Sequence, residues 1–411
     1  MPQQTSFEAI PHDVLYLVFR EFVMKRDLIH SCTFVCKRWR ALTFPYIFSS
    51  LKLLAKTDDD PDTSGLQINR YVDELIRDPF FPSIQHITSH LTLKWGRNSG
   101  NPIEFDFIDF IPSFSSLHSL TLVGRVCRHL PAAHASARGA IKLSSLAIEG
   151  HIRCNDNERR FPRSYEYHAA SALCDLLSLF GALQSLKLRK FSDAYLSFDK
   201  NVPFKWQHWT LPCPRSLVLD QILPDTGFFQ AAPLMKHVQN LDIAAAGVDY
   251  KASLPVIVAA CGPLRKLSIT ADSFDDEFRV HSVARPVIEP VYNSASLASL
   301  KVLVLCIRAK ENGSDPQGAV ATAAARVRMF AASIASLDCI DIRLGLSPVG
   351  LVDAAARCRI LAEFLIVFQE GAARFRDLED ALLDCVDAGG ATHVRLKLDL
   401  RPCISCFSTA L

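Results

Sequence analysis

The feature that most constrains the fold is a six-residue phrase with apolar residues at its first, fourth and sixth positions. In an extended strand the fourth and sixth side chains point to one side and the fifth points to the other, so each copy predicts a strand with one buried face. The clear copies begin at Leu117 (LHSLTL), Leu143, Leu183, Pro214, Val238, Leu264, Leu300, Leu337, Leu361 and Ala391. A weaker copy, TSHLTL, begins at Thr88.

The spacing of this phrase indicates a repeat array. Successive copies lie about 30 residues apart on average, slightly above the range of leucine-rich repeats. Several gaps carry helix-like apolar patterns, in segments 166–182, 224–237, 251–261, 320–337 and 373–388. Strand and helix in alternation predict a parallel sheet with right-handed crossovers. Because no unit buries its leucine face alone, we expect a curved α/β solenoid, with the sheet on the concave face and helices on the convex face.

Bulk composition argues against several classes of function. The 411 residues carry 45 Lys and Arg against 43 Asp and Glu, a formal charge of +2, so no global charge attracts nucleic acid or an anionic membrane. No apolar run approaches the roughly 20 residues that cross a bilayer. The N-terminus lacks the basic region followed by an apolar region that marks a secretory signal. We therefore expect a cytoplasmic or nuclear protein with no nucleic-acid or membrane partner.

Cysteine usage favours structural thiols. The 13 cysteines are an odd number, and many occupy positions that want a small apolar residue. Cys403 and Cys406 have Cys-x-x-Cys spacing, with Cys385 and His393 as conceivable partners, but reduced thiols are favoured over a zinc or redox site. The sequence contains no Gly-rich phosphate loop, no His-Glu-x-x-His and no Gly-x-Ser-x-Gly. It predicts neither a catalytic constellation nor a cofactor.

Two amphipathic helices are expected near the N-terminus. Pro11 suits a first helical turn, and the first apolar stripe consists of Val14, Leu15, Val18, Phe19 and Phe22. Asp27 is a suitable cap for a second helix, whose stripe consists of Leu28, Cys32, Val35, Cys36 and Trp39. A cluster of about 45 residues buries too little surface to be stable alone, so it needs a partner or a neighbouring domain.

The segment IPHDVLYLVFREFVMKRDLIHSCTFVCKRWRALTFPYIFSSLKL resembles an F-box. Ile10-Pro11 stands where that motif has Leu-Pro, Asp13 where it has an acidic residue, and Asp27-Leu28 and residues 35–40 match its second half. In that family the cluster binds the Skp adaptor of a cullin-type ubiquitin ligase, and the rest of the chain holds the substrate. The resemblance implies a set of residues that face the adaptor or pack the cluster, two roles that the sequence does not divide: Ile10, Pro11, Leu15, Val18, Phe19, Leu28, Val35, Cys36 and Trp39.

The irregular repeats resemble the divergent leucine-rich repeats found behind many fungal F-boxes, although the usual Asn or Cys after the phrase is absent. On this solenoid the outward residues of each strand form the concave surface. The candidate substrate-binding residues are Lys94, Trp95, Lys187, Arg189, Asp220, Asp242, Lys266, Asp341, Arg343, Arg395 and Lys397. Their mixed signs suit a protein partner better than a phosphate backbone. Val302 and Val304 predict either an exposed apolar patch or a covered strand.

These patterns divide the chain into a tail at 1–7, an F-box at 8–53, an acidic linker at 54–68, the repeat array at 69–400 and a tail at 401–411. The leading hypothesis is a non-catalytic substrate-recognition adaptor of a cullin-type (SCF) ubiquitin ligase. It would bind the Skp subunit, and through it a cullin, by the F-box, and a protein substrate by the repeats. A Skp-bound scaffold without ubiquitination is the alternative, and a hydrolase or nucleic-acid binder ranks last.

Overall fold

The structure is a computed structural model. The residues it describes are 10–22, 31–32, 34–54, 81–95, 103, 105, 107–126, 129–150, 164–189, 209–220, 232–244, 250–272, 294–309, 327, 337–346, 376, 378, 380–383 and 391–399. The predicted tails at 1–7 and 401–411, and the predicted linker from residue 55 on, lie outside this set.

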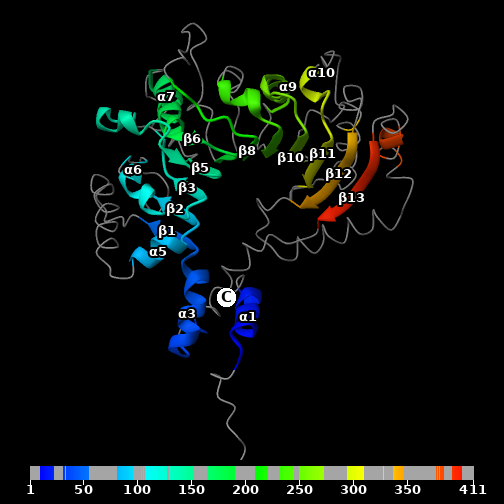
Figure 1. Cartoon of the computed structure of the whole chain (residues 1–411). Helices are drawn as coiled ribbons and strands as arrows, with labels where there is room; N and C mark the ends of the chain where they lie inside the picture. The colour runs from blue at the N-terminus through cyan, green and yellow to red at the C-terminus, as the bar shows by residue number, and fades with distance from the viewer. Residues whose placement is uncertain are drawn as a thin grey trace, which may run out of the picture.

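Within the described residues, eleven parallel strands form one open sheet. They are β1 (Ser50–Leu54), β2 (His90–Lys94), β3 (Ser119–Val123), β5 (Ser145–Glu149), β7 (Ser185–Arg189), β8 (Ser216–Asp220), β9 (Asn240–Ala244), β10 (Lys266–Asp272), β11 (Val302–Ala309), β12 (Leu337–Leu346) and β13 (Ala391–Asp399). Their spatial order follows the chain, and Figure 1 shows the sheet curving from β1 at one end to β13 at the other. The predicted α/β fold with a parallel sheet is confirmed.

A repeated backbone contact spaces the strands. The carbonyl of the residue just before a strand accepts hydrogen bonds from two consecutive amides of the next unit, as Ser89 does from His118 at 2.9 Å and from Ser119 at 3.0 Å. The same pair of bonds recurs at the carbonyls of Ser49, His118, Ser144, Gln184, Arg215, Gln239, Arg265 and Lys301. We call the edge that these residues form the amino rim of the sheet. Backbone atoms make this pair of bonds, so it does not depend on the side chains; at Ser89 the hydroxyl adds a further bond to the Ser49 carbonyl at 3.1 Å.

The leucines of the phrase build the core. Partly exposed and buried residues alternate along β5, β7 and β8, and Leu146, Leu186 and Leu217 at the fourth phrase position are 0% exposed. One buried apolar cluster extends from Leu91 to Ala381. Burial of this kind stabilises by about 1.5–3 kcal/mol for each large apolar side chain. The predicted direction of the alternation is therefore correct.

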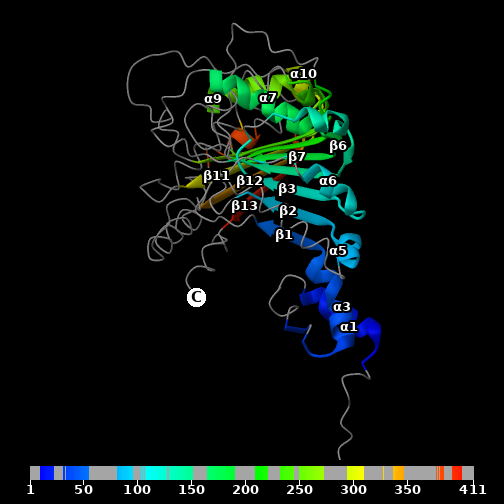
Figure 2. The ribbon, with the colours of Figure 1, turned by 90° about the vertical axis from the view of Figure 1, so that its left-hand side faces the viewer.

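Helices cover the outer face of the sheet. Figures 1 and 2 both place α7 (Ser164–Ser178), α9 (Tyr250–Ala260) and α10 (Ser294–Leu297) on the convex side. The remaining described connections contain α5 (Phe81–Ile87), α6 (Phe107–Phe110), η3 (Ile111–Ser113), η4 (Ala132–Ala137), η8 (Pro233–His237) and a small second sheet of β4 (Ile141–Lys142) with β6 (Phe180–Ala182). This helical layer does not cover the opposite, concave face of the large sheet.

Before the sheet the described residues include the helices α1 (His12–Phe22) and α3 (Lys37–Phe48), which we call the helical pair. Phe19 and Trp39 meet edge to face between them, with ring centroids 5.2 Å apart. At the end of α3, Thr88 Oγ1 donates to the Phe48 carbonyl oxygen at 2.9 Å. The helical pair is thereby joined to the first connection of the sheet, as Figure 1 shows at the β1 end.

The boundary between the helices and the sheet differs from the predicted one. Ser50–Leu54 pairs with β2 in register and is the first strand of the sheet, whereas the sequence assigned residues 50–53 to the F-box and residue 54 to the linker. The SLKL sequence has the leucine alternation of the other strands. The missed signal is a full copy of the phrase, FSSLKL from Phe48, whose first apolar residue is also the last residue of α3.

Three further predictions about elements differ from the structure or lie partly outside the described residues. Phe34 and Val35 form a turn and Cys36 is extended (φ −161°, ψ 168°), so the stripe from Leu28 to Trp39 is not one helix. The phrase at Leu361 lies outside the described residues, and β12 pairs directly with β13. A helical segment was predicted at 224–237, and the described part of it is the short 3₁₀ helix η8.

Candidate functional site

The helical pair has an inner and an outer apolar surface. Leu15 and Phe19 are 2% and 0% exposed and lie on the side of α1 that meets Trp39. Val14, Leu17 and Val18 are 47%, 57% and 40% exposed. Residues three and four apart share a helix face, so these three form one stripe on the outer side of α1. The structure thus separates packing residues from surface residues.

The turn before α3 extends the exposed apolar character. Phe34 is 71% exposed and Val35 is 55% exposed. The turn is held from behind: the Cys36 Sγ accepts a long hydrogen bond from the Trp39 amide at 3.5 Å, and the Arg40 amide donates to the Cys36 carbonyl at 3.0 Å. The capped start of α3 therefore fixes the position of the exposed Phe34 and Val35 side chains.

The other implied adaptor residues have mixed roles. Arg38 Nη2 donates to the Ile10 carbonyl oxygen at 2.8 Å and fastens the start of α1 to α3. Ile10, Cys36 and Trp39 are half-buried, and Pro11 is exposed. Leu28 lies outside the described residues. Of the nine implied residues, Pro11, Val18 and Val35 are the exposed ones among those the structure describes.

The concave face of the sheet carries most of the predicted substrate residues at matched register positions. Lys94, Lys187, Arg189, Asp220 and Asp242 are half-buried there, and Lys266 is exposed. Arg395 and Lys397 occupy β13, where the ladder pairs them with Asp341 and Arg343. The polar side chains between these charges are small, with serine at the first position of β3, β5, β7 and β8.

Two predicted substrate residues are not available to a partner. Trp95 is 1% exposed and packs against Phe107, with ring centroids 6.1 Å apart, because it follows the outward Lys94 and consecutive residues of a strand point to opposite faces. Asp341 is 7% exposed, and Arg343 holds its Oδ2 through Nη2 at 2.8 Å and Nε at 3.1 Å. Arg343 remains partly exposed.

Burial divides the concave face into two regions. On β10 to β12 the residues Ser268, Thr270, Val304 and Asp341 are all less than a tenth exposed, so the face is covered there. Val304 accordingly belongs to a covered strand and not to an exposed apolar patch. On β2 to β9 the concave positions are partly exposed except Val123. The accessible region is therefore the part of the face nearer the helical pair.

Three charges pair across the accessible region. Arg189 on β7 lies between carboxylates of the strands on either side, with Nε 2.8 Å from Asp220 Oδ2 and Nη1 3.7 Å from Glu149 Oε2. The in-register pairing of β5, β7 and β8 sets these three residues side by side. The cluster combines one cation with two carboxylates near Lys187, and such a mixture of signs suits a polar protein partner.

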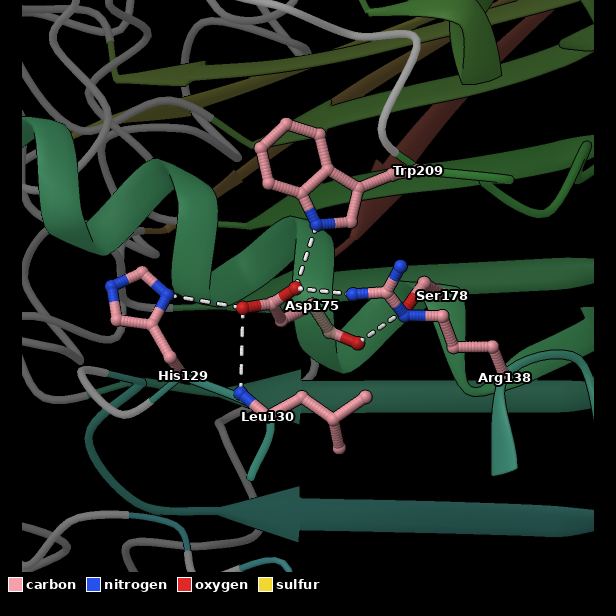
Figure 3. A network of polar contacts seen from close by, with 6 residues as sticks. All are labelled: His129, Leu130, Arg138, Asp175, Ser178 and Trp209. Atoms are coloured by element: carbon pink, nitrogen blue, oxygen red, sulfur yellow. Dashed lines mark hydrogen bonds and ion pairs between the residues drawn. The ribbon is translucent and has the colours of Figure 1, made fainter. Parts of the chain in front are cut away.

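A polar network on the helical layer resembles a reactive centre at first sight (Figure 3). Asp175 Oδ2 lies 3.0 Å from His129 Nδ1 and accepts from the Leu130 amide at 3.3 Å. Its Oδ1 accepts from Trp209 Nε1 at 2.7 Å and lies 3.5 Å from Arg138 Nη2.

The hydroxyl next to this network, that of Ser178, is hydrogen-bonded to the backbone. Ser178 Oγ donates to the Asp175 backbone carbonyl at 2.7 Å, and Ser178 is 1% exposed, so it is not placed as a nucleophile for His129. The network has a structural use, because its members come from three consecutive connections of the repeat array. The sequence analysis did not identify Asp175. The available signal was a single acidic residue within the apolar stretch 171–180, which the structure shows to be uniformly buried.

The thiols show no reactive setting where they are described. Burial raises the pKa of Cys261 to about 12 and raises that of Cys174 further still, so both are neutral at ordinary pH. Among the described residues no group of three or more His, Cys, Asp or Glu side chains is placed to hold a metal ion. Cys385, Cys403 and Cys406 lie outside the described residues, as does the side chain of His393.

Across the described helices, none has both the length and the apolar character needed to cross a bilayer. Comparisons with known proteins add no relative: no family model matches the chain, and no curated protein and no solved structure match it. The functional argument therefore depends on the chain's own surfaces.

Proposed function

We propose that this protein is an F-box-type substrate-recognition adaptor, which binds a Skp-family subunit of a cullin-type ubiquitin ligase through the helical pair. The observation that carries the proposal is the distribution of exposed apolar side chains. In the described part of the chain six large apolar side chains are exposed, and five of them, Val14, Leu17, Val18, Phe34 and Val35, belong to the helical pair and its turn. Concentrated apolar exposure of this kind is typical of a protein-binding surface.

The internal packing strengthens this interpretation. Leu15, Phe19 and Trp39 already pack between the two helices, so the outer stripe is not needed for the internal packing of the helical pair. A partner that covers the stripe gains burial energy without disturbing this packing. The order of Ile10-Pro11, an acidic residue and the Cys36 to Arg40 segment is what the F-box resemblance requires of the same two helices.

The accessible concave face supports the second half of the proposal. It offers half-buried charges of both signs between β2 and β9, on a rigid backbone ladder, at the end of the sheet that joins the helical pair. A protein substrate held there stays close to the adaptor-binding helices. Ubiquitin transfer itself would be carried out by other subunits.

Capture on an immobilised Skp adaptor tests the proposal. We expect Val14→Asp with Val18→Asp to reduce recovery about tenfold or more, since the change places two charges in an apolar interface. The matched control is Ala41→Asp with Pro45→Asp, which puts the same charges at the same spacing on exposed positions of α3. Leu15 and Phe19 are unsuitable for this test because substitution there disrupts the core.

Recovery of the Val14 and Val18 variant equal to that of wild type, with both variants showing the wild-type thermal unfolding, would contradict adaptor binding by this stripe. Affinity capture with and without proteasome inhibition then separates the two roles downstream of Skp. Clients that accumulate only under inhibition support a ligase subunit, whereas clients unaffected by inhibition support the scaffold alternative.

A further inference from the structure

The amino rim of the sheet changes character along its length. At the steps into β2, β3, β5 and β7 its exposed or half-buried residues are uncharged or histidine: Ser89, His118, Ser144 and Gln184. At the steps into β8, β10 and β11 the exposed residues include four cations, which we call the basic rim: Arg215, Arg265, Lys266 and Lys301.

The backbone ladder holds the basic rim together. The Arg215 carbonyl accepts from the Gln239 amide at 2.8 Å, the Gln239 carbonyl from the Arg265 amide at 2.7 Å, and the Arg265 carbonyl from the Lys301 amide at 2.9 Å. Neighbouring strands lie about 4.8 Å apart, so the three steps from Arg215 to Lys301 span about 14 Å. An extended peptide of four or five residues covers roughly the same distance.

The charge of the basic rim is largely uncompensated. The segments that lead into β8 to β11, 209–216, 233–240, 261–266 and 294–302, contain no Asp or Glu. Lys301 Nζ lies 3.4 Å from Asp338 Oδ1 in a pair whose side chains are 49% and 60% exposed, which is a weak contact. The chain as a whole has a formal charge of only +2, so this concentration is local.

We infer that the basic rim is a binding surface for an acidic polypeptide segment. Carboxylates on alternate residues of an extended peptide would meet Arg215, Arg265 and Lys301 in turn, with Lys266 at the border of the concave face. Ser216 and Asn240, the first residues of β8 and β9, lie beside the cations and offer hydrogen bonds to peptide groups. This surface is separate from the helical pair, and the inference does not depend on adaptor binding.

The composition of the rim favours a peptide over a nucleic acid. The segments 233–240, 261–266 and 294–302 contain no Phe, Tyr or Trp, and His237 is the single aromatic ring in them on which a base could stack. Trp209, in the remaining segment, is engaged with Asp175. Four cations over about 14 Å match a short acidic segment, whereas a nucleic-acid site generally continues as a longer basic groove.

Fluorescence anisotropy with the full chain tests this inference. The probe is a fluorescein-labelled peptide in which glutamate alternates with serine, and the matched peptide replaces every glutamate by glutamine. We expect the glutamate peptide to bind, the glutamine peptide to bind at least tenfold more weakly, and added salt to weaken the former. Arg215→Gln with Arg265→Gln and Lys301→Gln should lower the affinity about tenfold or more, at roughly 0.5 kcal/mol for each lost pair.

The control variant carries Lys37→Gln, Lys52→Gln and Lys142→Gln, the same charge change at exposed lysines outside the basic rim, and should bind as wild type does. No binding of the glutamate peptide, equal binding of the two peptides, or equal loss in the control variant would overturn the inference. Tighter binding of a single-stranded oligonucleotide, lost in the rim variant, would also overturn it and identify a nucleic-acid site instead. Skp capture by the rim variant should be unchanged, so failure here is distinguishable from failure of the adaptor proposal.

Discussion

At the scale of single residues, Asp175 shows how one side chain stabilises several repeats. Its side chain is about a tenth exposed and contacts the segment 129–138, which lies between β3 and β5, and Trp209, which lies between β7 and β8. The residue itself belongs to α7, between β5 and β7. Four groups contact this nearly buried carboxylate, and all four contacts are lost when it is removed.

We expect Asp175→Ala to lower the free energy of unfolding by about 3 kcal/mol. The substitution removes the acceptor of the Trp209 indole N–H and the contacts of the carboxylate with Arg138 and His129. Urea unfolding followed by circular dichroism measures the change. The comparison is Asp338→Ala, whose exposed pair with Lys301 should cost less than about 1 kcal/mol. Similar values for the two variants would show that the network around Asp175 contributes no more than a surface contact.

Residue-scale predictions from sequence were right where alternation decided the answer and wrong where it was not applied. The buried leucines and the outward Lys187 and Arg189 follow from strand periodicity. Trp95 was wrongly placed on the surface because it was grouped with its neighbour Lys94. The acceptor role of Asp175 was not predictable, since its partners are 34 to 46 residues away in sequence.

At the scale of elements, the helical pair separates two uses of apolar residues. Leu15 and Phe19 lie four residues apart and face α3, while Val14, Leu17 and Val18 face outward. An isolated sequence shows only that all five are apolar. The division requires knowing where α3 packs, and the turn at Phe34 and Val35 determines this by ending the preceding segment before α3 begins.

We expect Phe19→Ala to destabilise the helical pair by about 3 kcal/mol, because it removes a fully buried ring and its edge-to-face contact with Trp39. Val18→Ala, at a position 40% exposed, should cost less than about 1 kcal/mol. Hydrogen exchange measured by mass spectrometry should show faster exchange in residues 12–48 of the Phe19 variant alone. Unchanged exchange there would mean that the packing of α1 on α3 is not what stabilises these helices.

At the scale of the whole molecule, an uninterrupted sheet links the helical pair, the accessible concave face and the basic rim. Each strand pairs in register with the next from β1 to β13, and the apolar cluster beneath runs through the same units. Contacts between neighbouring repeats are what hold such an array together. Cys174 in α7 and Cys261 after α9 are buried in this common core and report on its continuity.

We expect alkylation at pH 8 to modify Cys213, which is exposed, and to spare Cys174 and Cys261 in the native protein. Burial raises the pKa of Cys261 to about 12 and that of Cys174 higher, with the charge of Asp175 adding to the effect at Cys174, so the reactive thiolate is scarce in the folded state. Both protected thiols should become reactive over the same range of urea. Well-separated midpoints, measured by mass spectrometry, would show that neighbouring repeats unfold independently.

The sequence by itself determined the parallel repeat architecture, because strand alternation and phrase spacing are local properties that a linear chain displays directly. It also predicted two amphipathic helices at the N-terminus. Only the tertiary structure decided where α3 ends and the first strand, Ser50–Leu54, begins, that the concave face is covered from β10 to β12, and that cations from three connections line one edge. These features arise from contacts between segments distant in sequence, and a side chain's exposure depends on what packs against it, which no local pattern records.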